Sequence, residues 1–302
     1  MLDDLEMPRV LTIQSTVVSG YVGNKVALFP LQLHGFETSA INSVQLSNHT
    51  GYQYFKGQVL GAKEIDELYE GLKLNKLNSF SFILTGYMAS KSFLEKVGEA
   101  IREMKQENPN TIYLCDPVMG DNGEMYVPEE LLPVYRDILV PLSDITVPNQ
   151  FEAECLTGIK INNLTDSIKA IECIHKLGVQ TVIMSSSTLG KGTNTLVCIA
   201  SRYTESGVER YKIEFPHIDA IFVGTGDLFS ATILIWLHKD KNLKTALEKT
   251  VSVIQFVIQK TIAAASKTAQ GRSDSAANME LKLIQCKKEL EDPKIQYFAE
   301  TL

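Results

Sequence analysis

The chain has 302 residues, of which 44% are hydrophobic and 22% are charged, as is typical of a folded protein with a large core. Its net charge of −7 and the lack of a basic stripe argue against nucleic-acid binding. Residues 1–6 are acidic and contain no apolar stretch, so we expect no signal peptide there, no membrane association and a cytoplasmic location.

Five scattered cysteines form no Cys-x-x-Cys pair, and the five histidines show no metal-ligand spacing. Several of these cysteines lie in apolar runs, where a free thiol usually behaves as a small buried side chain. We therefore expect structural thiols in a reducing compartment rather than disulfides or a zinc site.

Short β-branched runs alternate with helical patterns along the first two thirds of the chain. This alternation predicts a mainly parallel sheet with helices on both faces, because strands covered on both sides are apolar throughout. The predicted strands are residues 10–14, 38–44, 80–85, 111–116, 144–147 and 181–185. The predicted helices between them are residues 24–33, 63–74, 92–107, 129–139 and 165–177.

The pattern changes after Gly190. Residues 195–201 and 209–215, joined through Thr204-Glu205-Ser206-Gly207, predict a hairpin that adds an antiparallel edge to the sheet. Helices are expected over about residues 227–238, 244–265 and 278–290. No Pro/Gly/Ser-rich linker divides the chain, so we expect one α/β domain over residues 1–302.

Residues 220–237 form a greasy run with a single carboxylate, Asp227, behind the turn Gly224-Thr225-Gly226. The break inside the run argues against a membrane span and favours a loop that becomes a buried helix at residue 226 or 227. The first N–H groups of a helix have no internal partner and attract anions, and the flanking glycines let an anion approach closely. Asp227 beside such an anion hole suggests phosphate chemistry.

The predicted strands end in polar residues, and in open α/β sheets ligands bind beyond these carboxyl ends. Asp116 follows one strand within Asp116-Pro-Val-Met-Gly-Asp121, and could either face a cation or cap a turn. Asn149 and Glu152 follow another strand, and could either share a functional face or form a helix capping box. The set at the strand ends comprises Ser15, Thr50, Tyr87, Asp116, Asn149, Glu152, Ser185 and Ser186.

Three common nucleotide or hydrolase motifs are missing. Gly190-Lys191-Gly192-Thr193 approaches a P-loop but lacks its spacing. No Gly-x-Gly-x-x-Gly follows the first strand, and Gly-x-Ser-x-Gly is absent.

Val223-Gly224-Thr225-Gly226-Asp227 together with Asn149-Gln150-Phe151-Glu152 resembles the signature pair of the ribokinase-like superfamily. Further segments narrow the resemblance to pyridoxal kinases of the eukaryotic type, over residues from about 9 to the C-terminus. These segments are Ile13-Gln14-Ser15, Gly20-Tyr21-Val22-Gly23-Asn24, Asn42-Ser43-Val44-Gln45, Ser47-Asn48-His49-Thr50-Gly51-Tyr52, Leu84-Thr85-Gly86-Tyr87, Cys115-Asp116-Pro117-Val118 and Met125-Tyr126-Val127-Pro128.

The resemblance implies a three-layer ribokinase-like fold, a homodimer, and ATP-dependent phosphorylation of the 5′-hydroxymethyl group of pyridoxal and its vitamers. It implies that Asp227 is the general base and that the backbone of Gly224, Thr225, Gly226 and Asp227 holds the phosphoryl charge. Ser15, Thr50 and Tyr87 would bind the pyridine ring, and Asp116, Asp121 and Glu152 would order Mg²⁺ and its waters. The implied ATP-binding residues are Asp116, Asn149, Glu152, Ser185, Ser186, Ile218, Asp219, Ala220 and Thr225.

The resemblance also implies a monovalent cation, K⁺ or Na⁺, near the phosphates. Val147 stands where related sequences often have Thr, so a changed ion preference is expected, and the loop 121–125 is shorter than in animal relatives. Two other functions stay open. One is a hydroxymethylpyrimidine kinase, whose substrate also presents a ring hydroxymethyl group, and the other is a catalytically silent scaffold on a kinase fold, against which the intact carboxylates argue.

Overall fold

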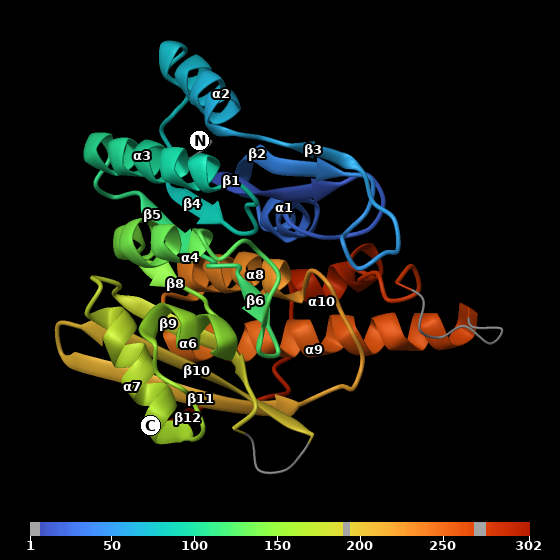
Figure 1. Cartoon of the computed structure of the whole chain (residues 1–302). Helices are drawn as coiled ribbons and strands as arrows, with labels where there is room; N and C mark the ends of the chain where they lie inside the picture. The colour runs from blue at the N-terminus through green and yellow to red at the C-terminus, as the bar shows by residue number, and fades with distance from the viewer. Residues whose placement is uncertain (1–6, 190–193, 269–275) are drawn as a thin grey trace, which may run out of the picture.

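A computed structural model describes residues 7–189, 194–268 and 276–302 (Figure 1). Residues 1–6 and the P-loop-like segment 190–193 lie outside the described residues. The chain folds into a ten-stranded sheet covered by helices on both faces, together with a separate two-stranded ribbon.

The centre of the sheet is parallel, as the sequence predicts. All six expected strands are present, and neighbours in the order β9-β8-β5-β4-β1-β2 pair in parallel. Their bounds are β1 Arg9–Val17, β2 Glu37–Leu46, β4 Phe82–Thr85, β5 Ile112–Cys115, β8 Ile145–Thr146 and β9 Thr181–Ser187. Their carboxyl ends consequently meet at one edge of the sheet, where the sequence places its polar residues.

Antiparallel strands lie at both edges of the sheet. The expected hairpin is formed by β10 (Thr195–Thr204) and β11 (Gly207–Pro216), with Thr204 opposite Gly207. Beyond it lies the short strand β12 (Glu300–Thr301), and β3 (Gly57–Val59) pairs with β2 at the other edge. The sequence analysis missed β3 and β12, because such short exposed strands carry no alternating pattern.

The helices form two layers. Helices α1 (Asn24–Leu33), α8 (Thr225–Asp240) and α9 (Leu243–Thr268) share one apolar core with the sheet. The opposite core contains residues of α2, α3, α4, α6 and α7. Neighbouring strand residues alternate between the cores: Phe82 and Leu84 face the α8 side, whereas Ile83 faces the other. The remaining helices are α2 Ala62–Leu74, α3 Lys91–Glu107, α4 Leu131–Val134, α5 Val140–Leu142, α6 Gln150–Thr157, α7 Leu164–His175 and α10 Lys287–Glu291.

One predicted helix is largely wrong. Residues 278–290 contain only a short 3-10 turn at Ile284–Cys286 and the first residues of α10. Tertiary contacts override the helical propensity here, since Leu281 and Leu283 are both fully buried. Side chains two positions apart point to the same side of an extended chain but not of a helix. The helix expected over 129–139 is also irregular, because a π-helical turn at Tyr135–Leu139 links α4 to α5.

The segment expected as a short loop after Asp121 is a tight hairpin. Strands β6 (Gly120–Asp121) and β7 (Glu124–Met125) pair around Asn122 and Gly123. Both turn residues have positive φ, 51° and 82°, as a two-residue hairpin loop requires. The Asn-Gly pair in the sequence is the signal that predicts this turn.

The five cysteines are free thiols, and Cys115, Cys198 and Cys286 are buried, in agreement with the expected structural role. In the described part of the chain, no helix is both long and apolar enough to cross a membrane. The helical part of the greasy run is core, since α8 residues Leu228 to Trp236 are all buried, whereas Ile221 before the turn is exposed.

Candidate active site

Helix α8 begins at the edge where the parallel strands end. Its N-cap, Gly224, has φ 91° and provides no side-chain cap, so the first N–H groups of the helix are available to an anion. A Cβ atom at Gly224 would lie 2.5 Å from the carbonyl oxygen of Tyr21, which no side chain tolerates. Only glycine therefore permits this turn, and the helix starts without a side-chain cap.

Asp227 lies in the first turn of α8 and is held from a distant part of the chain. The backbone N–H of Gly23 donates to Asp227 Oδ2 at 2.6 Å. Burial raises the pKa of Asp227, and the bond from Gly23 partly opposes this rise. A carboxylate with a fixed direction and a raised pKa is suited to accept a proton from a substrate hydroxyl.

Asp116 lies directly against the start of α8. Its Oδ2 accepts a hydrogen bond from Ser230 Oγ at 2.9 Å, and a Cβ atom at Gly226 would stand 3.9 Å from the same oxygen. Burial, together with the nearby charge of Asp227, raises the pKa of Asp116 to about 8. The structure therefore brings these two predicted carboxylates, Asp116 and Asp227, together.

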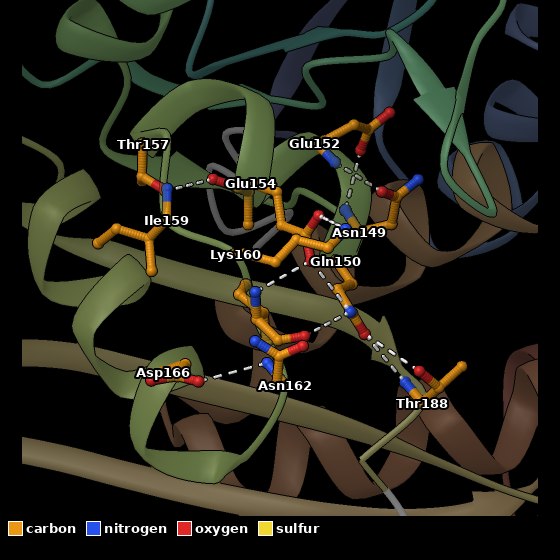
Figure 2. Close-up of polar contacts among 12 residues, drawn as sticks. Asn149, Gln150, Glu152, Glu154, Thr157, Ile159, Lys160, Asn162, Asp166 and Thr188 are labelled. Atoms are coloured by element: carbon orange, nitrogen blue, oxygen red, sulfur yellow. Dashed lines mark hydrogen bonds and ion pairs between the residues drawn. The ribbon is translucent and has the colours of Figure 1, made fainter.

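Asn149 and Glu152 form a capping box at the start of α6, drawn in Figure 2. Asn149 Oδ1 accepts from the Glu152 N–H at 2.9 Å, and Glu152 Oε2 accepts from the Asn149 N–H at 2.8 Å. The second carboxylate oxygen of Glu152 accepts from the Met119 N–H at 3.0 Å. Burial and the nearby charge of Asp116 raise the pKa of Glu152 well above its ordinary range. The capping interpretation is confirmed, and the box fixes a buried carboxylate that lies close enough to Asp116 to feel its charge.

These carboxylates suit a hard divalent cation. Within the described ranges, no lysine or arginine pairs with Asp116, Glu152 or Asp227, so buried negative charge is uncompensated. Mg²⁺ prefers carboxylate oxygens and often takes only one or two of them, with phosphates and waters as its other ligands. Asp116 and Glu152 fit that requirement.

Asp121 does not join these two carboxylates. It is exposed on β6, and its Oδ1 accepts a hydrogen bond from the N–H of its neighbour Asn122 at 2.8 Å. Among the described residues, no group of three or more His, Cys, Asp or Glu side chains could hold a metal ion. The hairpin turn at residues 122–123 carries Asp121 toward solvent, so a three-carboxylate ligand set is not formed.

Gln150 connects the capping box to the end of β9 (Figure 2). Its Oε1 accepts from the N–H of Thr188 at 3.1 Å, and its Nε2 donates to the Ile161 carbonyl at 3.0 Å and to Glu154 Oε1 at 3.2 Å. Glu154 in turn pairs with Lys160 at 2.5 Å. The network ties the start of α6 to the strand that carries Ser185 and Ser186.

The predicted ring-binding residues come from three different loops or strand ends. Ser15 is buried in β1, and a Cβ atom at Gly23 would lie 2.5 Å from its Oγ, so Ser15 borders the turn that holds Asp227. Tyr87 is half-buried, and its carbonyl accepts from Ser43 Oγ at 2.7 Å. Thr50 is exposed on the loop after β2.

The remaining predicted nucleotide residues lie on β9, at the first residue of α8 and in the segment that precedes α8. Ser185 donates from both its N–H and its Oγ to the Pro148 carbonyl, at 2.9 and 3.4 Å, which joins β9 to the start of α6. Ser186 and Thr225 are half-buried. Ile218 packs on the core, whereas Asp219 and Ala220 are exposed in a turn closed by the Ala220 N–H and the Ile218 carbonyl at 2.8 Å.

Sequence reasoning missed several contacts that shape this site. Gly23, Ser230, Gln150 and Glu280 were assigned no role, although they bond Asp227, Asp116, Thr188 and Tyr21 respectively. Ser230 could have been found, because it lies three residues after Asp227 on one helix face. The partners of Gly23 and Glu280 are more than 200 positions away in sequence, so no local pattern shows them.

Comparisons with known proteins establish the family of the chain. Residues 32–272 match the family model described as phosphomethylpyrimidine kinase. The chain is 50% identical to the pyridoxal kinase of Ovis aries and 49% identical to that of Homo sapiens, each alignment covering 97% of this chain and 98% of the relative. The chain belongs to the pyridoxal kinase family.

Solved structures support the same assignment. The pyridoxal kinase of Leishmania donovani, in complex with ADP and pyridoxamine, matches with a TM-score of 0.89 and 34% identity over 98% of this chain and 99% of that chain. The Plasmodium falciparum enzyme, with AMP-PNP and PL, matches with a TM-score of 0.85 and 27% identity over 98% and 99%. The expected ribokinase-like α/β fold is confirmed, and family membership makes this chain an ATP-dependent phosphotransferase.

Proposed function

We propose that this protein transfers the γ-phosphoryl group of ATP to the 5′-hydroxymethyl group of pyridoxal, with pyridoxine and pyridoxamine as further substrates. The observation that carries the proposal is the pairing of Asp227, held by Gly23 at 2.6 Å, with the uncapped helix start at Gly224. A base and an anion site in adjacent residues are what transfer to an alcohol requires. The Leishmania donovani relative was solved with ADP and pyridoxamine, which correspond to the nucleotide product and the alcohol substrate of this reaction.

Asp227 takes the proton of the substrate hydroxyl as the oxygen attacks phosphorus. The N–H groups of Gly224, Thr225, Gly226 and Asp227 hold the negative charge of the transferring group. General-base help is worth roughly 10²–10⁴ in rate, and each donor in comparable anion holes roughly 10²–10³. Phosphoryl transfer depends mainly on positioning and electrostatics, so the protein supplies what the chemistry needs.

The other predicted residues serve binding. Ser15, Thr50 and Tyr87 hold the pyridine ring on the side of Gly23, and the phosphates of ATP lie over the ends of β8 and β9. Asp116 and Glu152 would hold Mg²⁺, whereas Asp121 lies in solvent and is not proposed as a direct ligand. When bound, Mg²⁺ neutralises charge on the phosphates. The residues proposed for the nucleotide are Asn149, Ser185, Ser186, Ile218, Asp219, Ala220 and Thr225.

We further propose a K⁺ or Na⁺ ion near the phosphates, a homodimer, one domain over residues 1–302, and the cytoplasm as the compartment, in keeping with the free thiols. Val147 is buried and offers no side-chain hydroxyl, so this residue itself could contact a monovalent cation only through its backbone carbonyl. Activity in K⁺ and in Na⁺ should therefore differ less than in relatives with Thr at this position.

A hydroxymethylpyrimidine kinase is the second candidate, favoured by the description of the matching family model. A coupled assay of ATP consumption with pyridoxal, pyridoxine, pyridoxamine and hydroxymethylpyrimidine separates the two. The proposal requires a kcat/KM for pyridoxal at least about tenfold above that for hydroxymethylpyrimidine. The reverse order would establish the second candidate, and no turnover with any of the four alcohols would leave a silent scaffold.

A further inference from the structure

Glu280 lies at the meeting point of three chain segments. Its side chain is only 11% exposed, and it lies in the segment 278–290, where a helix was wrongly expected. The carboxylate occupies space that a side chain at Gly20 would fill, since a Cβ atom there would collide with both carboxylate oxygens. Gly20 has φ 97°, so the turn and the carboxylate fit only with glycine at that position.

Two donors to Glu280 come from the Thr50 loop, residues 47–54. The Tyr52 hydroxyl donates to Oε1 at 3.1 Å. The Gly51 N–H donates to His49 Nδ1 at 3.1 Å, so the proton of a neutral His49 ring is on Nε2. That atom lies 3.4 Å from Glu280 Oε1. The rings of His49 and Tyr52 meet edge to face at 4.7 Å, which makes the pair one packed unit.

The third donor belongs to the turn at residues 20–23. The Tyr21 N–H donates to Glu280 Oε2 at 2.8 Å, and the carbonyl of the same Tyr21 lies against Gly224 at the start of α8. Two residues further on, the Gly23 N–H bonds Asp227. Glu280 therefore holds the turn that sets both the anion hole and the proposed base.

Neighbouring contacts connect the same parts. Leu281 is fully buried, and its Cδ1 would lie 3.5 Å from a Cβ atom at Gly224. A Cβ atom at Gly51 would lie 3.9 Å from Val223 Cγ2. Burial acts to raise the pKa of Glu280, but the bonds from His49, Tyr21 and Tyr52 outweigh it and lower the pKa. A charged carboxylate receives stronger hydrogen bonds than a neutral group.

We propose that Glu280 is a positioning residue, which fixes the Thr50 loop and the turn at residues 20–23 around the hydroxymethyl substrate and Asp227. This inference rests on the proposed phosphoryl transfer but touches a residue outside the reacting groups. Three donors converge on two oxygens, and an amide replaces one of those oxygens with an NH₂ group. A glutamine at this position leaves at least one donor facing another donor.

The test compares steady-state kinetics of Glu280→Gln with the wild-type chain, using whichever of the four alcohols the wild type phosphorylates best. A failure of the pyridoxal assignment therefore leaves this test intact. We expect the KM for the alcohol to rise about tenfold and kcat to fall about threefold, with the KM for ATP within about twofold. Glu291→Gln, an exposed glutamate on the same C-terminal segment, is the matched control and should change neither KM.

Two results in Glu280→Gln would overturn the proposal. One is that the KM for the alcohol and the KM for ATP both stay within about twofold of the wild-type values, and the other is that both rise by the same factor. Tyr52→Phe supplies a second measurement, because it removes a single hydroxyl and leaves the carboxylate in place. Its KM for the alcohol should rise about two- to fivefold. Should Glu280→Gln fail to fold, an unchanged alcohol KM in Tyr52→Phe overturns the proposal by itself.

Discussion

The carboxylate of Asp227 accepts a hydrogen bond from the backbone N–H of Gly23 at 2.6 Å, across 204 positions of sequence. This contact joins the start of α8 to the turn before α1. The helices α1 and α8 pack against each other on one face of the sheet. The proposed base therefore has its direction set by main chain rather than by a second flexible side chain.

Replacing Asp227 tests the base. Asp227→Ala should abolish turnover, and Asp227→Asn should lower kcat by roughly 10²–10⁴, because the amide can still accept from Gly23 but cannot take a proton. Binding of pyridoxal and of ATP, measured by titration, should stay within about threefold. Asp240→Asn, at the other end of the same helix, is the control. Near-normal turnover in Asp227→Ala would remove the proposed mechanism.

Gly224→Ala separates backbone strain from the loss of the anion hole. Gly224 has φ 91° and lies against the Tyr21 carbonyl, whereas Gly35 has φ 84° with open space around it. The positive φ should cost both alanine variants about 1–2 kcal/mol of unfolding free energy, and Gly224→Ala should lose more than Gly35→Ala because its Cβ atom also meets the Tyr21 carbonyl. Only Gly224→Ala should also lose roughly 10²–10³ in kcat. Equal activity of the two variants, measured beside their unfolding curves, would contradict the anion-hole assignment.

The raised pKa of Asp116 predicts how stability depends on pH without metal. Its pKa rises from an ordinary value of 3.8 to about 8 on folding, so between these pH values the folded chain holds a proton that the unfolded chain releases. The free energy of unfolding should therefore fall as pH rises through this window. Because Mg²⁺ competes with that proton, it should raise the melting temperature more at pH 8 than at pH 6.

Asp116→Asn is the matching variant for this pH effect. It should raise the metal-free melting temperature at pH 8 by roughly 1–2 °C, corresponding to about 1 kcal/mol for a chain of this size, and should abolish the response to Mg²⁺. Asp66→Asn, an exposed carboxylate on α2, should change neither. A melting temperature that rises with pH in the metal-free wild type would show that the carboxylate is compensated in another way.

Gln150→Leu tests the link between the capping box and β9. The variant keeps the side-chain volume but removes the contacts to Thr188, Ile161 and Glu154, so the strand that carries Ser185 and Ser186 loses its anchor. We expect the KM for ATP to rise about three- to tenfold and the KM for pyridoxal to stay unchanged. Gln180→Ala, at the start of the same strand, is the control, since its Nε2 donates to the Tyr203 carbonyl. An ATP KM that moves equally in both variants would refute a specific role for Gln150.

Local patterns were sufficient for the parallel sheet, the edge hairpin and the capping box of Asn149 and Glu152. Each of these depends on residues close together in sequence: apolar runs covered on both faces, a two-residue turn, and a side-chain pair three positions apart. The clustering of polar residues at one edge of the sheet also follows, since the carboxyl ends of parallel strands meet at the same edge. The segment 278–290 shows where such reasoning fails, because buried Leu281 and Leu283 outweigh its helical propensity.

Sequence alone was enough to identify the family, to find polar residues at the strand ends and to put Asp227 beside a helix start. The groups that hold these residues in place are visible only in the folded chain: Gly23 for Asp227, Ser230 for Asp116 and Glu280 for the Thr50 loop. The tertiary structure also decided that Asp121 lies in solvent rather than with Asp116 and Glu152. The physical reason is that periodicity and capping act over a few residues, whereas these bonds close loops of up to 259 positions and exist only once the sheet and both helix layers have packed.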